Sequence, residues 1–475
     1  MKKVLYLICL FLLTNYFSTS AQSIDQLYHW EDPTLVGSNA YDNTYNEIWG
    51  LVRNDKEFAV IGSTYGTHIF DVTDTDNVVE VAKIPGAFQG GGVIHRDFHD
   101  YKDHLYIVCD EGTGTSTLQI VDISDLPNSF EVVTDSKQAL STSHNIFIDT
   151  THAKLYACGG ATSDGLGGNK SFRLKVFDLA DDPTKPVELF TTKDEFGYIH
   201  DIYVKDNIAY LNAGSGSGLI VVDFTDTSAP ITLGKMDEYS AYGQGYNHSG
   251  WLSEDGSIYA FADETHGIPI KICDASDPTD LVVLSTVRAD NLPDQEIPHN
   301  LMIRGNYLFV SYYYDGLVIF DISDPEEPKK VAEYDTYAGE HRRSYEGAWG
   351  IYAFLPSGKL LVSDMQTGLY VLDFDLLTNE INNATSNQDL TATTENIQIT
   401  AFESTLQIQV QLKQAQRVQI ELFDLTGRLI QSYQSQQGIG QQQIQLDLPE
   451  TISGTYFIAK VKTKGAYYTQ KIYSH

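Results

Sequence analysis

Basic residues and cysteines are scarce in this chain of 475 residues. It has 31 Lys and Arg against 64 Asp and Glu, which gives a formal net charge of −33 at pH 7. Such a surface repels phosphate backbones and anionic lipids, so it argues against nucleic acid as a partner and favours cations. Of only four cysteines, Cys109, Cys158 and Cys273 lie in apolar strands. We expect them to be small buried side chains and not a disulfide framework.

Long apolar runs are also lacking. Residues 1–21 combine Lys2 and Lys3 with an apolar run over 4–13 and small residues up to Ala21, a pattern that predicts a signal peptide. This run is too short to span a bilayer, and no other segment approaches the required length of about twenty apolar residues. We therefore expect a secreted or outer-surface protein without a transmembrane segment.

Motifs for several kinds of chemistry are missing. The Gly-rich stretches at 159–169 and 213–218 lack the Lys-Ser/Thr pair and the following helix of a phosphate loop. The letters Gly-x-Ser-x-Gly occur at 214–218 but lead into a strand, so they do not predict a nucleophile elbow. No repeat has the density of oxygen ligands that a calcium loop needs.

One phrase, by contrast, recurs along most of the chain: an apolar strand, an Asp, one further residue, then usually Ser or Thr and a second Asp. The first Asp of each copy is Asp71, Asp122, Asp178, Asp223, Asp274, Asp321 and Asp373. A period of about fifty residues is typical of propellers and other repeat arrays. The phrase itself is turn chemistry, because Asp and Ser side chains cap the bend between two strands.

Each repeat holds further short strands, such as 208–211 and 186–190, without a helical pattern between them. Four strands in each of seven repeats predict an all-β protein, a seven-bladed β-propeller over residues 24–377. The seventh repeat lacks its fourth strand, and residues 27–37 are similar to the tail of a repeat. We therefore predict that an N-terminal strand closes the ring.

The composition changes after the propeller. Residues 378–396 form a polar linker, and strict alternation over 397–475 predicts a small C-terminal β-sandwich. The stretches FDLTGRLI at 423–430 and ISGTYFIAKV at 452–461 resemble the C-terminal sorting domain of type IX secretion substrates in Bacteroidetes. This resemblance implies export by the type IX secretion machinery, with removal of the domain and release or surface attachment. An ordinary adhesion module is the alternative.

The repeats carry a second resemblance. GLVIFDISDPEEP at 316–328 and GLIVVDFTDTSAP at 218–230 resemble LVIVD-repeat propellers. The stretch EGAWGIYAFLPSGKLLVSDMQTGLYVL at 346–372 is similar to the choice-of-anchor B group. That group joins such a propeller to various C-terminal anchors, so the resemblance implies a surface location and no established reaction.

Polar and aromatic residues recur at the start of the predicted innermost strands. Because the second strand of each blade runs back antiparallel, these residues and the loops after the second strands should share one mouth of the central channel. The predicted ligand-binding residues are Trp49, Arg96, His144, His200, His248, His299 and Trp349, with Asp110, Glu111, Asp263, Glu264 and Asp364 from the loops and strand ends.

Three interpretations of this mouth remain open. In the first, each His or Asn bonds a neighbouring blade and has a packing role only. In the second, which we favour, the propeller is a binding or scaffolding module for a surface carbohydrate or peptide, aided by the Tyr-rich segments 239–251 and 311–315. In the third, His144, His200, His248 and His299 hold a divalent metal such as zinc or copper in a metal-dependent hydrolase or oxidoreductase. No catalytic residue is predicted.

Overall fold

The computed structural model describes residues 24–166, 168–192, 195–378, 397–402, 405–412, 415–423, 429–449, 456–462 and 467–473. The predicted signal peptide lies outside the described residues, as does the predicted linker except for its first residue. The chain divides into two compact units: one reaches Phe374 but leaves out 356–358, and the other holds those three residues and everything from Asp375 on. Each unit is described by itself.

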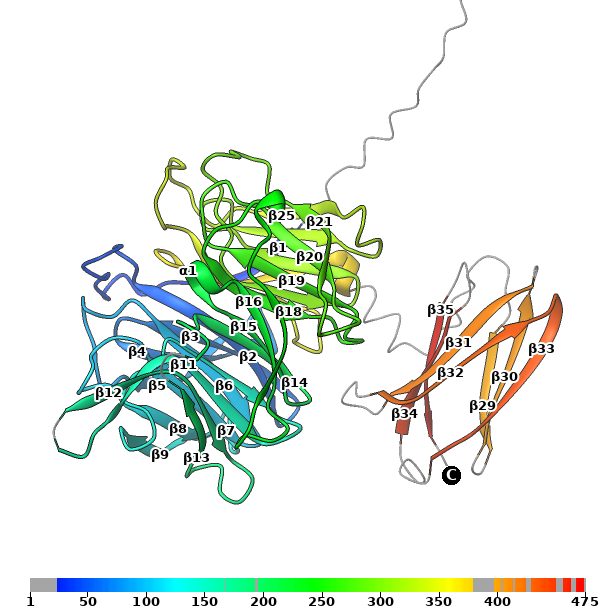
Figure 1. Ribbon diagram of the computed structural model, residues 1–475, viewed down its shortest axis with the longest axis horizontal. Helices are drawn as coiled ribbons and strands as arrows, with labels where there is room; N and C mark the ends of the chain where they lie inside the picture. Colours follow the sequence, from blue (N-terminus) through cyan, green and yellow to red (C-terminus); the bar gives the residue numbers. More distant parts are fainter. Residues whose placement is uncertain are drawn as a thin grey trace, which may run out of the picture. The chain divides into compact units, whose positions relative to one another are not determined.

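The first unit consists of seven antiparallel sheets of four strands (Figure 1). The first four sheets contain β2 (Tyr45–Arg53), β3 (Lys56–Ser63), β4 (Gly66–Asp71) and β5 (Val79–Pro85); β6 (Arg96–Tyr101), β7 (His104–Cys109), β8 (Leu118–Asp122) and β9 (Glu131–Ser136); β10 (Asn145–Asp149), β11 (Lys154–Ser163), β12 (Asn169–Asp178) and β13 (Val187–Thr192); and β14 (Asp201–Lys205), β15 (Ile208–Asn212), β16 (Leu219–Asp223) and β17 (Ile231–Met236). The other three contain β18 (Asn247–Leu252), β19 (Ile258–Asp263), β20 (Ile270–Asp274) and β21 (Val282–Val287); β22 (Leu301–Arg304), β23 (Tyr307–Ser311), β24 (Leu317–Asp321) and β25 (Lys329–Tyr334); and β26 (Ala348–Tyr352), β27 (Leu360–Asp364), β28 (Gly368–Phe374) and β1 (Ile24–Trp30). The expectation of an all-β protein is confirmed.

The first strand of each sheet lies beside the first strands of its neighbours. The contacts run from β2 to β6, β10, β14, β18, β22 and β26, and β26 in turn packs against β2. A sheet whose strands follow chain order has its first strand at one edge, so these seven edges meet around a common channel. This is the arrangement of a β-propeller.

Strand β1 completes the seventh sheet from the other end of the unit. It pairs antiparallel with β28, with Ile24 opposite Phe374 and Trp30 opposite Leu369. The sequence placed this strand within 27–37, but it ends at Trp30, before the Asp-Pro pair. Asp32 Oδ1 accepts hydrogen bonds from the backbone and hydroxyl of Thr34, and this turn follows the strand instead of preceding it.

The recurring Asp residues cap turns, as the sequence predicted. Asp71 Oδ1 accepts from the backbone nitrogen of Thr73 at 3.1 Å. Asp226 Oδ1 accepts from the backbone and hydroxyl of Ser228 at 2.9 and 2.6 Å. These bonds satisfy local backbone groups between the third and fourth strands.

Neighbouring sheets are held together by apolar side chains from both. One core cluster joins Phe58 of the first sheet to Phe98 and Ile107 of the second. Another joins Ile61 to Leu361 and so connects the first sheet to the seventh. The cysteines predicted to be buried, Cys109, Cys158 and Cys273, are buried and free.

The second unit holds two sheets around one core. Their strands are β29 (Ile397–Phe402), β30 (Thr405–Leu412) and β33 (Gly440–Asp447) in one sheet, and β32 (Leu429–Gln437), β31 (Gln416–Phe423), β34 (Tyr456–Lys462) and β35 (Tyr467–Tyr473) in the other. Leu406, Ile420 and Phe457 belong to the shared core. Parts of the sorting-domain motifs, residues 424–428 and 452–455, lie outside the described residues.

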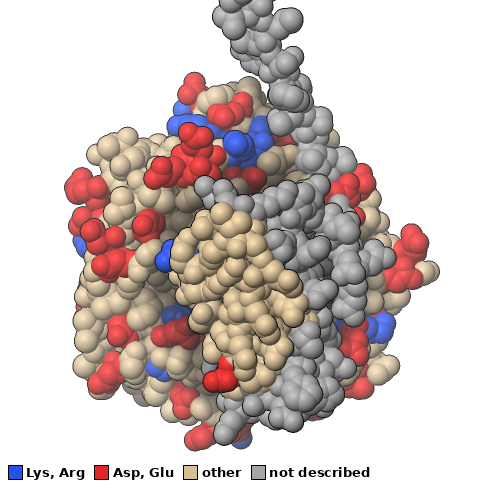
Figure 2. All heavy atoms as spheres, turned by 90° about the vertical axis from the view of Figure 1, so that its right-hand side faces the viewer, with Lys and Arg blue, Asp and Glu red and all other residues tan. Residues whose placement is uncertain are grey.

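The surface carries the excess of acidic residues that the composition implies. Figure 2 shows Asp and Glu side chains spread over the visible face, with basic side chains among them. Among the described residues, no helix is long and apolar enough to cross a membrane.

Replacement of Trp30 tests how strongly β1 ties the last sheet to the first. Its ring lies 5.5 Å from that of Tyr45 and 4.7 Å from that of Phe70. Because Trp30→Ala removes this half-buried packing, we expect the free energy of unfolding to fall by about 2 kcal/mol in urea titrations. Leu27→Ala, on the exposed side of the same strand, is the control and should change it by less than about 0.5 kcal/mol. Equal effects of the two changes would contradict this role.

Candidate functional site

Six ring side chains surround one end of the channel. Consecutive members have ring centroids between 4.0 and 5.0 Å apart, and the sixth lies 5.0 Å from the first. This set, which we call the imidazole crown, consists of His95, His144, His200, His248, His299 and Trp349. Six of the seven sheets contribute one member each.

The crown follows from the position of these residues at the start of the first strands. His95, His144 and His200 directly precede β6, β10 and β14. His248 and Trp349 lie at bulges near the starts of β18 and β26. Because the first strands meet at the channel, a ring side chain at each start is placed against the next one.

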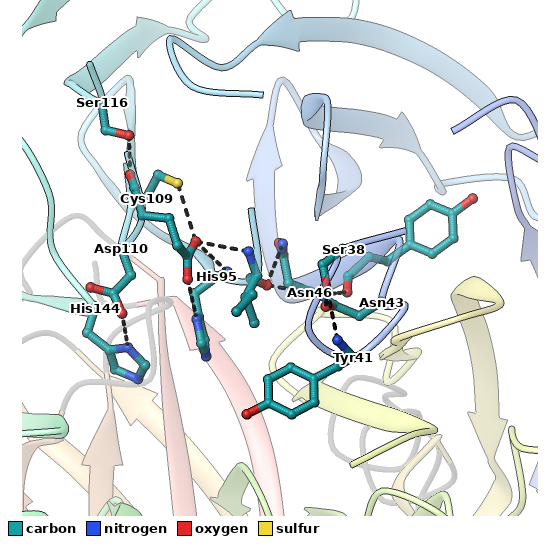
Figure 3. Close-up of polar contacts among 12 residues, drawn as sticks. Ser38, Tyr41, Asn43, Asn46, His95, Cys109, Asp110, Ser116 and His144 are labelled. Carbon is teal, nitrogen blue, oxygen red and sulfur yellow. Dashed lines mark hydrogen bonds and ion pairs between the residues drawn. The ribbon is translucent and has the colours of Figure 1, made fainter. Parts of the chain in front are cut away.

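Four of the imidazoles have their Nδ1 atoms bonded outside the crown cavity. The Nδ1 of His144 lies 2.9 Å from Asp110 Oδ2, and that of His95 lies 2.9 Å from Glu111 Oε1 (Figure 3). Glu111 also accepts the backbone N–H of His95 at 3.0 Å. Asp110 and Glu111 therefore fix two of the rings.

Backbone carbonyl oxygens bond the Nδ1 atoms of the other two imidazoles, those of His200 and His299. His200 Nδ1 lies 3.3 Å from the carbonyl oxygen of His248, and His299 Nδ1 lies 2.5 Å from that of Trp349. A carbonyl oxygen accepts only, so both rings donate from Nδ1 and carry their lone pair on Nε2. Among the described residues, none hydrogen-bonds Nε2 of His95 or of these two rings.

His248 is bound differently. Its Nδ1 is buried without a hydrogen-bond partner, and its Nε2 lies 3.7 Å from Glu264 Oε2. Tyr313 donates to Glu264 Oε1 at 2.6 Å. Burial raises the pKa of Glu264 to about 7.

Three crown imidazoles, those of His200, His248 and His299, have lowered pKa values and are neutral at neutral pH. Burial, with the neighbouring imidazoles, holds the pKa values of His200 and His248 well below the usual range. Burial lowers the pKa of His299 to about 3. Burial also acts against the charge of His144, but the hydrogen bond and the charge of Asp110 outweigh it and raise the pKa of His144.

A belt of acidic and amide side chains lies next to the crown along the same strands. It comprises Glu47, Asp97, Asn145, Asp201 and Asn300, all of which line both the crown cavity and the next part of the channel. Asn300 Nδ2 donates to Glu47 Oε2 at 2.6 Å. Backbone N–H groups of Ile146 and Ile202 each donate to an Asp oxygen of the belt at 2.6 Å.

The three acids of the belt resist ionisation together. Burial, with the charge of Asp97, raises the pKa of Glu47 well above its usual range. Burial raises the pKa of Asp97 to about 7, and burial with the charge of Asp97 raises that of Asp201 to about 8. Removing any one charge therefore eases the ionisation of the others.

The space inside the crown is small. Its volume for water is about 20 Å³, and a single water needs about 10–15 Å³ by the same measure. One water or one metal ion fits there, whereas a sugar ring or an amino-acid side chain does not. Two groups of side chains bring potential ligand atoms within 4.8 Å of one another: His95, Asp110 and His144, and His200, His248 and Glu264.

The structure brings together most of the residues that the sequence singled out. His144, His200, His248, His299 and Trp349 form the crown, and Asp110, Glu111 and Glu264 contact its imidazoles. The sequence analysis missed His95, which directly precedes the predicted Arg96. It also missed Glu47, Asp97 and Asp201, although acidic or amide residues recur two positions before an aromatic side chain in these strands.

Two predicted channel residues are not members of the crown. Arg96 lines the crown cavity, as predicted, but its guanidinium donates to the carbonyl oxygens of Ser63 and Phe88 and so joins the first sheet to the second, while His95 supplies the ring in the crown. Trp49 donates from Nε1 to Asp100 at 2.9 Å and lines the channel beyond the belt. Glu47, two residues earlier, takes the place at the crown cavity.

Two predicted acids form hydrogen bonds or ion pairs with residues outside the crown and do not line its cavity. Asp263 is fully buried, lies 2.5 Å from Lys271 Nζ and accepts from the Tyr239 hydroxyl at 2.9 Å. Asp364 accepts from the Thr336 hydroxyl at 2.7 Å and from the backbone N–H of Gln366 at 2.9 Å. Neither lines the crown cavity.

Comparisons with protein families agree with both units. Residues 196–238 and 298–336 match the LVIVD repeat, and residues 402–474 match a secretion system C-terminal sorting domain. The sorting domain indicates a secreted or outer-surface protein that uses the type IX secretion machinery. Among curated proteins, no sequence matches this chain.

Solved structures of low sequence identity resemble the chain. The β-propeller domain of Cps50 (Swd1) from Myceliophthora thermophila is 12% identical, with 74% of this chain and 99% of that one covered and a TM-score of 0.48. Sqt1 of Saccharomyces cerevisiae is 11% identical, covers 67% and 81%, and has a TM-score of 0.45. The periplasmic gluconolactonase PpgL of Pseudomonas aeruginosa is 11% identical, covers 85% and 99%, and has a TM-score of 0.49. These likenesses carry no argument about activity.

The pH dependence of folding tests the raised pKa of Asp201. The folded protein holds this proton up to about pH 8, whereas an unfolded chain releases it near pH 4. The folded state therefore binds more protons between these values, and its stability falls as the pH rises. In Asp201→Asn this loss is absent. About four pH units at 1.36 kcal/mol each set an upper limit of about 5 kcal/mol, so we expect the variant to exceed the native protein by several kcal/mol at pH 8 in urea titrations with chelator.

At pH 4 the difference between the two proteins should nearly vanish. Asp280→Asn, at an exposed turn, is the matched control and should follow the native protein at both pH values. A constant difference between Asp201→Asn and the native protein from pH 4 to pH 8 would contradict the raised pKa.

Proposed function

We propose that this chain is a secreted or outer-surface β-propeller that binds a divalent transition-metal cation in the imidazole crown. The observation that carries the proposal is the anchoring of four imidazoles at Nδ1 around a cavity of ionic size. In metal sites, the ring nitrogen that does not bind the metal almost always donates to a carboxylate or a backbone carbonyl. Here, Asp110 and Glu111 supply the carboxylates, and two carbonyl oxygens supply the rest.

The chemistry of these donors selects the kind of cation. Neutral imidazole nitrogen suits borderline ions such as zinc and copper, whereas magnesium and calcium prefer oxygen. Because the pKa values of His200, His248 and His299 are lowered, their lone pairs are available at neutral pH. The nearby acids of the belt can offset the positive charge. A carbohydrate or peptide in this mouth is disfavoured by the volume of about 20 Å³.

The proposal includes the finer architecture. Seven sheets form seven blades of one ring, closed by β1 as the outer strand of the last blade. The pairing of β1 with β28 and the contact of β26 with β2 support this closure. We further propose the division into a signal peptide (1–21), the propeller (24–377), a linker (378–396) and the sorting domain (397–475), and membership of the choice-of-anchor B group of Bacteroidetes. The LVIVD and sorting-domain matches support that assignment.

Metal analysis of the mature protein tests the site. After dialysis against chelator and then zinc or copper, we expect about one tightly bound ion per chain by elemental analysis, and an increase in melting temperature with metal. His200→Phe and His299→Phe keep a ring of similar size but remove its nitrogens, so each should weaken binding at least tenfold in calorimetric titrations. His152→Phe is the control, because His152 is bonded to Asp149 outside the crown.

The same titrations can refute the proposal. A protein that retains no ion after loading, or binding that is equally strong in the His200 and His152 variants, would assign the crown a packing role. The melting temperature of each metal-free variant shows whether it has folded, so a loss of binding is not confused with a loss of structure.

A further inference from the structure

A second closed set of aromatic side chains surrounds the channel on the other side of the belt. Consecutive ring centroids are 4.5 to 5.9 Å apart around the whole circle. This set, which we call the aromatic collar, consists of Trp49, His99, Phe147, Tyr203, Trp251, Phe354 and Tyr352. None of its members belongs to the imidazole crown.

The spacing in the strands places the collar directly beside the belt. Trp49 follows Glu47 by two residues, His99 follows Asp97 and Tyr203 follows Asp201. Side chains two positions apart in a strand point to the same side. Each acid of the belt is thus followed, one step further along the channel, by an aromatic side chain.

A cavity of about 60 Å³ lies between the collar and the belt. Trp49, His99, Phe147 and Trp251 line it together with the acids of the belt and Asn145. Phe147 and Trp251 are only partly buried. The buried Oδ1 of Asn145 has no hydrogen-bond partner. The cavity therefore combines aromatic faces with the oxygens of the belt acids and with one buried acceptor, Asn145 Oδ1, that lacks a donor.

No cation of the protein occupies this cavity. None of its lining residues is Lys or Arg. Two arginines near the collar bond other groups. Arg53 lies 3.0 Å from Asp100, and Arg304 donates to the carbonyl oxygens of Ala353 and Leu355, with its guanidinium 6.0 Å from the centroid of the Phe354 ring. Aromatic faces attract a cation by their quadrupoles. The oxygens of the belt acids can accept hydrogen bonds from it, and a bound cation would in turn favour the loss of their protons.

We propose that the aromatic collar binds a primary alkylammonium group. The three N–H donors of such a group match the belt carboxylates and the free oxygen of Asn145, and its methylene groups match the aromatic faces. The volume of about 60 Å³ holds the ammonium group with a short alkyl segment. Either a free small amine or the end of a lysine side chain has this chemistry. The proposal rests on the collar cavity and not on metal binding in the crown, although the belt lines both cavities.

Calorimetric titration of the chelator-treated mature protein tests the collar with three probes: n-butylammonium, the neutral isostere n-butanol, and Nα-acetyl-lysine methylamide. We expect butylammonium to bind with a dissociation constant in the millimolar range or below, and butanol to bind at least tenfold more weakly. Tighter binding of the lysine derivative would assign the site to protein side chains. Equal or weaker binding would assign it to free amines.

Variants of one collar residue separate recognition from folding. Trp251→Leu keeps apolar bulk but removes the aromatic face, so butylammonium should bind at least fivefold more weakly, whereas Trp251→Phe should retain most of the affinity. Tyr242→Leu, at an exposed position outside the channel, is the control. The proposal is overturned if butanol binds as well as butylammonium, or if Trp251→Leu binds butylammonium as well as the control does. It is also overturned if no binding of butylammonium is detected at concentrations up to about 50 mM.

The metal site in the crown and the amine site in the collar can be refuted separately. Loss of the crown ion in His200→Phe should leave amine binding unchanged, because His200 does not line the collar cavity. If amine binding disappears together with the ion, the two ends of the channel form one site and the collar is not a separate one.

Discussion

The packing of neighbouring sheets on one another is the constraint on which the rest of this structure depends. Each face of a sheet buries apolar side chains against one neighbouring sheet, as Phe58 does against Phe98. Such packing leaves the first strand of every sheet at the inner edge. Polar and aromatic residues of repeats far apart in the chain, such as Trp49 and Tyr352, therefore meet in one channel.

The channel concentrates groups that would not be found together on an open surface. Five imidazoles are crowded at one end, and Glu47, Asp97 and Asp201 are held away from water beside them. Burial and like charge both oppose ionisation, so His200, His248 and His299 stay neutral and the three acids hold their protons to high pH. The layers of the channel, from imidazole crown to belt to aromatic collar, thus offer nitrogen lone pairs, acidic oxygens and aromatic faces in turn. A cation is the kind of ligand that suits all three.

Much of the fold could be predicted because it is encoded locally. The spacing of the Asp turns sets the repeat, and alternating apolar residues set the strands. The crown histidines could also be found, because they recur before the small polar residue that opens each first strand. His95 escaped this reasoning, since the neighbouring Arg96 occupies the expected place, and only the structure shows that the Arg96 guanidinium bonds Ser63 and Phe88 while His95 joins the crown. The sequence analysis placed a closing strand within 27–37, whereas the strand that pairs with β28 ends at Trp30, because the Asp32 turn lies after it and not before it.

By itself, the sequence determined the all-β class, the repeat, the turns, the buried cysteines and the secreted location, because each rests on residues close together in the chain. Only the tertiary structure decided which side chains share the channel. Trp49 lies in the aromatic collar and not in the crown, and Asp263 is neutralised by Lys271 within its own sheet. The size of the crown cavity is likewise a product of seven sheets packing together. These distances join separate repeats, and no local pattern contains them.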